Sequence, residues 1–341
     1  MAGDVEVVEG ILVLVGTQIK YLGLYLNGRW KFVEHFRRLA PRVDKAAMAL
    51  SRLLPNLGGP DGRARRLYAG TVHAMTLYGA PVRVNEMEAT RNIKNCMHQV
   101  QRRVANRICR GYRTVSWAAV GVLAGVPPME QLARMYADVY RRIRELQAEG
   151  IALADRDRRI MRVHARRSLI ERWMDILGDP RMPGQRTVGA FRPCFQQWLV
   201  GGVSYKMTQV LTRHGCFGEY LCRIGKERTT RCAHCGHEKD DAQHTLEVCV
   251  TWENERRDLV TAVGADLSLP AVIAAAVGSD TGWRALYSFC EVVMLQKEEK
   301  EREREQTGER RRSSEQESGE EKSSSGDELP PPGGGDLPAF P

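Results

Sequence analysis

Three cysteines and one histidine in the last third of the chain constrain its fold most. They are Cys232, Cys235, His244 and Cys249, in the pattern C-x2-C-x8-H-x4-C. Zinc binds thiolate sulfur and imidazole nitrogen in a tetrahedron, and four protein ligands mark a structural site with no position left for water. The polar stretch 236–243 has no apolar core of its own, so metal binding would supply its folding free energy. The pattern predicts a small zinc knuckle.

Other interpretations of these residues stay open. The thiols could be ordinary buried cysteines beside a surface histidine. His234 and His237 lie close by and could replace His244 as the fourth ligand. We favour His244, because the longer loop before it lets its ring reach a site that the two cysteines of the turn already fix.

Positive charge is concentrated in the middle of the chain. The 341 residues carry a net charge of +9, and the stretch from Arg91 to Arg167 holds 17 Lys and Arg against 6 Asp and Glu. Such a field attracts polyanions, and the guanidinium fork matches phosphate geometry. A solvated helical face is the alternative, but the density and single sign favour phosphate binding. Cations also flank the knuckle, at Arg228, Arg231 and Lys239.

Cysteine usage predicts a reducing compartment. There are nine cysteines, an odd number, and those outside the knuckle lack the spacing of a disulfide framework. No signal peptide begins at Met1, and the apolar run 11–15 is far too short to span a bilayer. We therefore expect a protein of the nucleus or cytoplasm that makes no membrane contact.

Apolar periodicity predicts a mainly α fold. The first residues read as short β-branched strands with turns at Gly10, Gly16 and Gly23, an amino-terminal hairpin or sheet remnant that would be marginal alone. Helical spacing follows from Phe36 onward. The expected strands are 5–8, 11–15 and 19–26, and the expected helices are 36–54, 63–77, 88–109, 116–124, 128–146, 158–177, 203–214, 252–262 and 283–296.

These elements suggest an order of domains. A helical bundle precedes a Pro- and Gly-rich linker, and a smaller α unit with the knuckle follows it. The end of the chain is Glu-, Ser- and then Pro-rich, with too few apolar residues to pack, so we expect a disordered tail. We predict the strands at 1–30, the helical bundle at 31–177, the linker at 178–193, the unit with the knuckle at 194–296 and the disordered tail at 297–341.

Several segments together resemble a known family. Residues 20–23 (KYLG) resemble the segment just after the polymerase palm in non-LTR reverse transcriptases, and 111–116 (GYRTVS), followed by 122–125 (VLAG), is similar to the thumb region of Pol proteins of type-1 retrotransposable elements. Residues 77–80 (LYGA) and 214–217 (HGCF) belong to the same pattern, as does the knuckle. These elements insert into ribosomal RNA genes of insects. The resemblance covers about residues 1 to 290.

The resemblance implies roles for particular residues. Residues 1–30 would be the end of the palm, where Lys20 is a candidate phosphate contact on a primer-grip-like strand. Residues 31–177 would be a helical thumb that holds the RNA–DNA duplex by its backbone, and phosphate contacts of this kind position without specifying sequence. The knuckle, with Arg228, Arg231 and Lys239, would bind element RNA or target DNA. The thumb candidates are Arg102, Arg103, Arg107, Arg110 and Arg113, the last of which could equally make a helix-end salt bridge.

The parent protein of such a family would be an RNA-directed DNA polymerase with an associated endonuclease. Polymerase chemistry needs clustered aspartates that hold Mg²⁺, and the family's aromatic-Ala-Asp-Asp hairpin is absent from this sequence. We therefore expect a carboxyl-terminal fragment that is inactive alone, with zinc as its structural metal, RNA template and target DNA as partners, and the upstream palm and fingers of the same polyprotein beside it.

The sequence is also compatible with two other functions. The chain could be a free-standing, non-enzymatic zinc-dependent nucleic-acid-binding protein. Alternatively, its carboxyl-terminal part could itself be a nuclease, since endonucleases need carboxylates around a metal. The acids near the knuckle show no recognisable arrangement for this in the sequence; they are Glu219, Asp240, Asp241 and Glu247.

Overall fold

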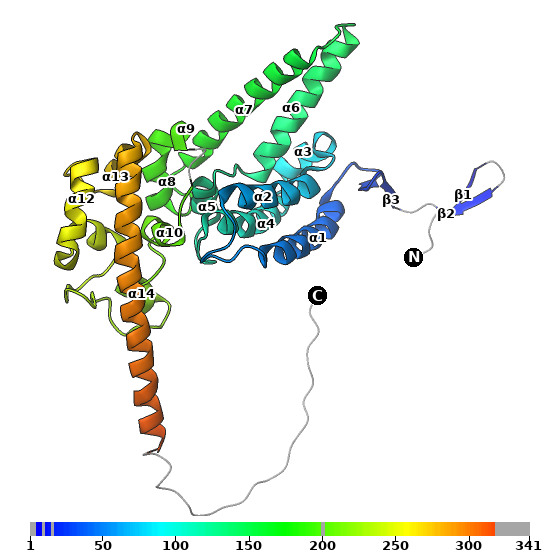
Figure 1. The fold of residues 1–341 in the computed structure, drawn as a ribbon. Helices are drawn as coiled ribbons and strands as arrows, with labels where there is room; N and C mark the ends of the chain where they lie inside the picture. Colours follow the sequence, from blue (N-terminus) through cyan, green and yellow to red (C-terminus); the bar gives the residue numbers. More distant parts are fainter. Residues whose placement is uncertain (1–4, 9–10, 15–16, 199–201, 318–341) are drawn as a thin grey trace, which may run out of the picture. The chain divides into compact units, whose positions relative to one another are not determined.

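The computed structural model describes residues 5–8, 11–14, 17–198 and 202–317, with side chains for 17–198 and 202–306. Within these residues the chain is mainly helical, with two small antiparallel hairpins near the amino terminus (Figure 1), so the predicted fold class is confirmed. The described residues up to Lys297 form one compact unit, and those from Glu298 onward form a second. No helix in the described part of the chain is long and apolar enough to cross a membrane.

Each hairpin pairs two neighbouring strands. In the second hairpin the turn residues Leu22 and Gly23 have φ angles of 45° and 83°, and tight two-residue hairpin turns need this positive combination. The Tyr78 hydroxyl donates to the Leu22 carbonyl at 2.9 Å, and Leu24 is buried, so this hairpin is anchored to the helices. The strands are β1 (Val5–Val8), β2 (Ile11–Leu14), β3 (Gln18–Tyr21) and β4 (Leu24–Asn27).

Five helices follow and share one apolar core. The central one, α4, packs against α1, α2 and α5, and buries Met97 and Val104 completely. Ser116 caps α5 by accepting the backbone N–H of Ala119, and Gly125 ends it in a left-handed conformation. The helices are α1 (Val33–Ser51), α2 (Gly62–Leu77), α3 (Ala80–Ala89), α4 (Arg91–Cys109) and α5 (Trp117–Ala124).

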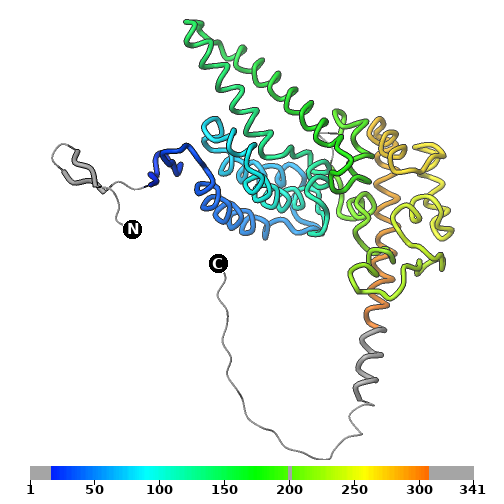
Figure 2. Tube along the Cα trace, turned by 180° about the vertical axis from the view of Figure 1, so that it is seen from behind, coloured from blue at the N-terminus to red at the C-terminus, as the bar shows by residue number. Residues whose placement is uncertain are grey.

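Two long helices, α6 (Met129–Ala148) and α7 (Asp155–Leu177), form an antiparallel hairpin. The start of α6 is buried against α3, and the end of α7 is buried through Leu169 and Trp173. Both views show the far ends of the two helices extending away from the other helices of the unit (Figures 1 and 2). Only the base of this hairpin therefore belongs to the shared core.

The remaining helices build the part of the same unit that carries the knuckle. Helix α13 packs against α8, and the indole N–H of Trp198 donates to the Val122 carbonyl at 2.8 Å. The apolar core of the first five helices thus continues into the part that carries the knuckle. The helices are α8 (Gln185–Phe191), α9 (Phe195–Trp198), α10 (Tyr205–Thr212), α11 (Gly218–Arg223), α12 (Glu253–Val263), α13 (Leu269–Val277) and α14 (Asp280–Glu317).

The structure differs from the expected organisation in two places. Helix α8 lies inside the expected linker 178–193, and its Val188 and Phe191 are buried. Helix α14 continues 20 residues beyond Lys297, where we expected the disordered tail to begin. Glu, Lys, Arg and Gln are good helix formers, and pairs such as Lys300 with Glu303 at 3.1 Å support an exposed helix. The tail from 318 lies outside the described residues.

Not every arginine of this basic chain faces solvent. Arg65 on α2 is 1% exposed, and its guanidinium donates to the carbonyls of Pro55 at 2.5 Å, Pro60 at 3.0 Å and Arg107 at 2.6 Å. Burial, followed by the charges of Arg110 and Arg107, lowers the pKa of Arg65 to about 10. This side chain ties the loop before α2 to the end of α4.

We expect Arg65→Met to lower the free energy of unfolding by about 3 kcal/mol, because it leaves several partly buried carbonyls without a donor. Urea denaturation would measure the loss. Arg63→Met is the matched control, because Arg63 is exposed on the same helix and should cost about 0.5 kcal/mol or less. Equal losses in the two variants would show that the buried hydrogen bonds of Arg65 contribute nothing.

Candidate metal centre and surrounding basic surface

A tight turn presents the first two cysteines of the knuckle. The N–H of Gly236 donates to the Cys232 carbonyl at 2.9 Å, and the N–H of Cys232 donates to the His237 carbonyl at 2.8 Å. Gly236 has φ of 75°, which glycine adopts without steric cost. The turn brings the thiols of Cys232 and Cys235 into the same cluster.

The other two residues lie at the two ends of a short π-helix, His244–Val248: His244 begins it and Cys249 directly follows it. Its backbone positions them, since the N–H of Cys249 donates to the His244 carbonyl at 2.8 Å. Asp241 accepts the N–H of His244 at 2.8 Å, and the guanidinium of Arg256 donates to the Cys249 carbonyl at 2.6 Å. Neither contact was predicted, because both depend on how the loop folds back on itself.

The four side chains converge within a space suited to one metal ion. Their ligand atoms all lie within 4.8 Å of one another. The sulfurs of Cys232 and Cys249 are 4.0 Å apart, and the Cys235 sulfur lies 3.3 Å from Nε2 of His244. Tetrahedral zinc with ordinary bond lengths sets S–S and S–N separations of about 3.8 and 3.6 Å. The predicted set is therefore assembled, and its donors fit zinc.

The sulfurs of Cys232 and Cys249 share a hydrogen bond. This hydrogen bond lowers the pKa of Cys232 to about 3 against the opposing effect of burial, with further help from the charge of Lys297. The same bond raises the pKa of Cys249. Zinc would bind both sulfurs as thiolates and would displace their protons.

The alternative histidines are occupied elsewhere. His237 accepts the N–H of Lys239 at 3.2 Å, and its ring stacks on that of His244 at 4.6 Å. His234 packs against Trp252, with ring centroids 4.8 Å apart. Trp252 itself is 1% exposed, so it offers no face to a nucleic-acid base. Of the three histidines, only His244 belongs to the cluster of ligand atoms.

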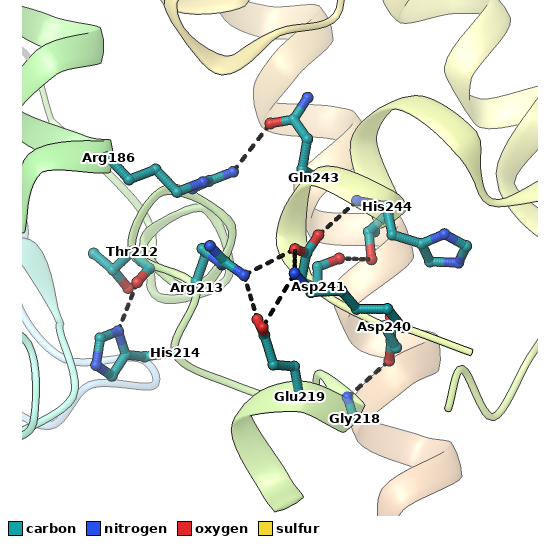
Figure 3. A network of polar contacts seen from close by, with 12 residues as sticks. Arg186, Thr212, Arg213, His214, Gly218, Glu219, Asp240, Asp241, Gln243 and His244 are labelled. Carbon is teal, nitrogen blue, oxygen red and sulfur yellow. Dashed lines mark hydrogen bonds and ion pairs between the residues drawn. The ribbon is translucent and has the colours of Figure 1, made fainter. Parts of the chain in front are cut away.

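An ion-pair network surrounds the knuckle (Figure 3). Arg213, at the end of α10, donates to Glu219 and, at 2.8 Å, to Asp241. The Lys239 amine lies 3.3 Å from Glu219 and 3.7 Å from Asp241. Burial would raise the pKa of Asp241, but the N–H of His244 and the charge of Arg213 hold it below its usual value. The network fastens the knuckle loop to α10 and α11.

A second, deeper pair lies beside it. The Lys297 amine contacts both carboxylate oxygens of Asp240, at 2.8 and 2.9 Å, with side-chain exposures of 1% and 4%. Asp240 also accepts the N–H of Gly218 at 2.9 Å (Figure 3), and burial raises its pKa despite the charge of Lys297. A Cβ on Gly218 would lie 2.6 Å from the Arg231 carbonyl, so the knuckle packs directly on α11.

These contacts occupy the acidic side chains that a nuclease would need to bind its metal ion. Glu219, Asp240 and Asp241 are each neutralised by a cation of the protein itself. Glu247 is exposed and accepts a hydrogen bond from Gln243 at 3.1 Å. Within the described side chains, the Cys and His cluster is the one group of three or more such residues able to hold a metal ion. The nuclease hypothesis gains no support from this arrangement.

The arginines predicted on and after α4 divide into two sets. Arg102 donates to the Arg113 carbonyl, Arg103 pairs with Asp44 at 2.5 Å, and Arg107 donates to the Leu54 carbonyl at 3.4 Å. These three contribute to the fold. The side chains of Arg110 and Arg113 have no ion-pair partner in the described part of the chain, so the helix-end salt bridge considered for Arg113 does not form there.

The cations near the knuckle also differ from one another. Arg228 and Arg231 are exposed and have no ion-pair partner among the described residues. Lys239 is exposed too, but it belongs to the network with Glu219 and Asp241. Lys20 is exposed on β3 between Ile19 and Tyr21, which are 62% and 59% exposed. The predicted cations are thus of two kinds: some are exposed and have no ion-pair partner among the described residues, and others stabilise the fold.

Comparison with known proteins gives the context of this site. The chain is 31% identical over 257 residues to a 115 kDa protein of the type-1 retrotransposable element R1DM of Drosophila melanogaster, an alignment covering 70% of this chain and 24% of that protein. It is 24% identical over 293 residues to a retrovirus-related Pol polyprotein of element R1 4 of Nasonia vitripennis, covering 82% and 72%. A third relative, the Pol polyprotein of element R1 of Bradysia coprophila, is 25% identical over 260 residues, covering 73% and 25%.

These relatives confirm the resemblance found in the sequence. The chain is similar over most of its length to proteins of R1 type-1 retrotransposable elements. It spans 24% of the length of the first relative and 25% of the third. No protein-family model and no solved structure matches the chain.

Proposed function

We propose that the chain is the nucleic-acid-binding part of a retrotransposon reverse transcriptase and that zinc folds its carboxyl-terminal portion. The assembly of Cys232, Cys235, His244 and Cys249 beside the exposed Arg228 and Arg231 supports this most directly. A metal-folded loop with free guanidinium groups can bind phosphate without active-site chemistry. The similarity to Pol polyproteins supplies the setting in which such binding would serve target-primed reverse transcription.

The helical part would act as a thumb. In this proposal residues 31–177 hold the RNA–DNA duplex through Arg110 and Arg113, whose charges are not compensated within the fold, and 194–296 bind template RNA or target DNA. Lys20, on the exposed hairpin β3–β4, would contact the primer strand. The apolar residues beside it on β3 would face the palm of the parent protein, which would supply the polymerase aspartates, their Mg²⁺ and the endonuclease.

Zinc content and binding test the proposal together. We expect one zinc per chain and tight binding of an RNA–DNA hybrid that weakens with salt, with a slope of about −0.9 per phosphate contact on logarithmic axes. The double variant Arg228→Gln/Arg231→Gln should bind more weakly and with a shallower slope. Arg181→Gln, an exposed arginine paired with Asp179 at 3.0 Å, is the control and should bind like the unaltered protein. Zinc-free protein that ignores polynucleotides at low salt would refute the proposal.

A primer-extension assay examines the enzymatic part of the proposal. Because the aspartate motif of the polymerase is absent from this sequence, we expect no Mg²⁺-dependent DNA synthesis by the chain alone. The intact parent protein serves as the positive control. Measurable synthesis by the chain would show that it holds polymerase chemistry of its own.

A further inference from the structure

The hairpin of α6 and α7 carries exposed positive charge that the described fold leaves uncompensated. From Arg158 to Ile170 the sequence contains five arginines and no acid. The two acids of the first turn of α7 precede this stretch, and one of them, Asp157, accepts the backbone N–H of Ala154 at 3.0 Å. Carboxylates thus lie next to the two ends of the basic stretch, at Asp157 and Glu171, and none lies within it.

Three of these arginines share a face of the helix. Arg159, Arg162 and Arg166 are spaced by three and four residues, which places them in one row. All three are exposed, and within the described residues none has an ion-pair partner. By contrast Arg141, Arg142 and Arg167 on the same hairpin pair with Asp138, Glu145 and Glu171, at 3.4, 3.2 and 3.1 Å.

The position of the row leaves it accessible. The far ends of α6 and α7 extend away from the other helices of the unit, as both ribbon and tube views show (Figures 1 and 2). Val163, between Arg162 and Arg166, is 67% exposed. The eight residues from Arg159 to Arg166 span roughly 10 Å of helix, along which a DNA duplex presents about six phosphate charges.

The side chains around the row favour a backbone contact. The residues of α7 from Arg156 to Ser168 include no Phe, Tyr or Trp, and the exposed rings of the hairpin, Tyr136 and Tyr140, belong to α6. Single-stranded nucleic acid is usually held by aromatic rings on which bases stack. Phosphates of a duplex, which need only positively charged donors, suit this surface better.

We propose that Arg159, Arg162 and Arg166 form a second duplex-binding surface on the projecting hairpin, separate from the knuckle. The inference rests on the proposed nucleic-acid binding and adds a site to it. The row would hold the sugar–phosphate backbone of a duplex at a place separate from Arg110 and Arg113 and from the knuckle. It would bind independently of sequence, because guanidinium contacts to phosphate carry no base information.

Two triple variants test the site by fluorescence anisotropy with a duplex and with a single strand of equal length. Arg159→Gln/Arg162→Gln/Arg166→Gln should weaken duplex binding about tenfold or more near physiological salt and reduce the salt slope by about 2.7. The control Arg141→Gln/Arg142→Gln/Arg167→Gln removes equal charge from paired positions and should weaken binding less than about threefold. Both variants should melt at the temperature of the unaltered protein.

The outcomes separate this inference from the proposed function. If the unaltered protein binds duplex and both triple variants bind equally well, the hairpin surface is refuted while the proposed function stands. Equal weakening in the two variants would indicate a diffuse charge effect and also refute the surface. If the unaltered protein binds no nucleic acid, both proposals fall. A loss confined to the single strand, or competition by polyglutamate as strong as by duplex, would also contradict a duplex site.

Discussion

Cys232→Ser should unfold the knuckle and abolish zinc binding while the helices α1 to α5 stay folded. Structural zinc contributes roughly 10–16 kcal/mol to the folding of isolated zinc-finger peptides, and the polar stretch 236–243 has no apolar core to replace it. The loss should include the contacts that depend on the loop, among them the N–H of Gly218 bound to Asp240.

Hydrogen exchange with zinc analysis would measure this effect. In the variant the amides of Gly236 and Cys249, which donate across the knuckle, should lose protection, and those of α4 should keep it. Cys222→Ser is the matched control, because Cys222 is half-buried on α11 and lies outside the cluster. Unchanged protection in Cys232→Ser would exclude a structural metal, and collapse of the whole unit would show that the knuckle cannot unfold locally.

Helical periodicity was enough to find most of the fold. The expected segments 63–77 and 116–124 correspond to α2 and α5, whose ends the structure marks with side-chain caps or a left-handed residue. Helical periodicity did not predict the helices that lack one apolar and one polar face. Helix α13 is almost wholly apolar, and α3 is preceded by Gly79 and has proline in its first turn, so neither shows the spacing that indicates an amphipathic helix.

The charge pattern was less informative about individual residues. It indicated a basic surface, but sequence density does not say which arginines face inward. Arg83 is 2% exposed and donates to the Tyr78 carbonyl at 2.5 Å, and Arg65 binds carbonyls in the same way. Such contacts depend on tertiary packing between distant segments. The metal ligands were predictable because their chemistry is local and their spacing is short.

Lys297 is another charged residue whose burial could not be read from the sequence. Its sequence context indicated the start of a disordered tail, but the side chain is 2% exposed. We expect Lys297→Met to lower the free energy of unfolding by about 3–5 kcal/mol, since the buried Asp240 would lose its only charged partner among the described contacts. Urea denaturation of the zinc-loaded protein would measure it. Lys300→Met, which removes an exposed lysine paired with Glu303, should cost at most about 1 kcal/mol.

A double variant distinguishes the charge effect from loss of packing. Asp240→Asn removes the carboxylate that Lys297→Met leaves unpaired and keeps an acceptor for the N–H of Gly218. If the penalty is electrostatic, the two substitutions combined should cost less than the sum of the single losses, by about 1–3 kcal/mol. Additive losses would mean that the length of the Lys297 side chain matters and its charge does not, so that α14 would hold the knuckle by packing alone.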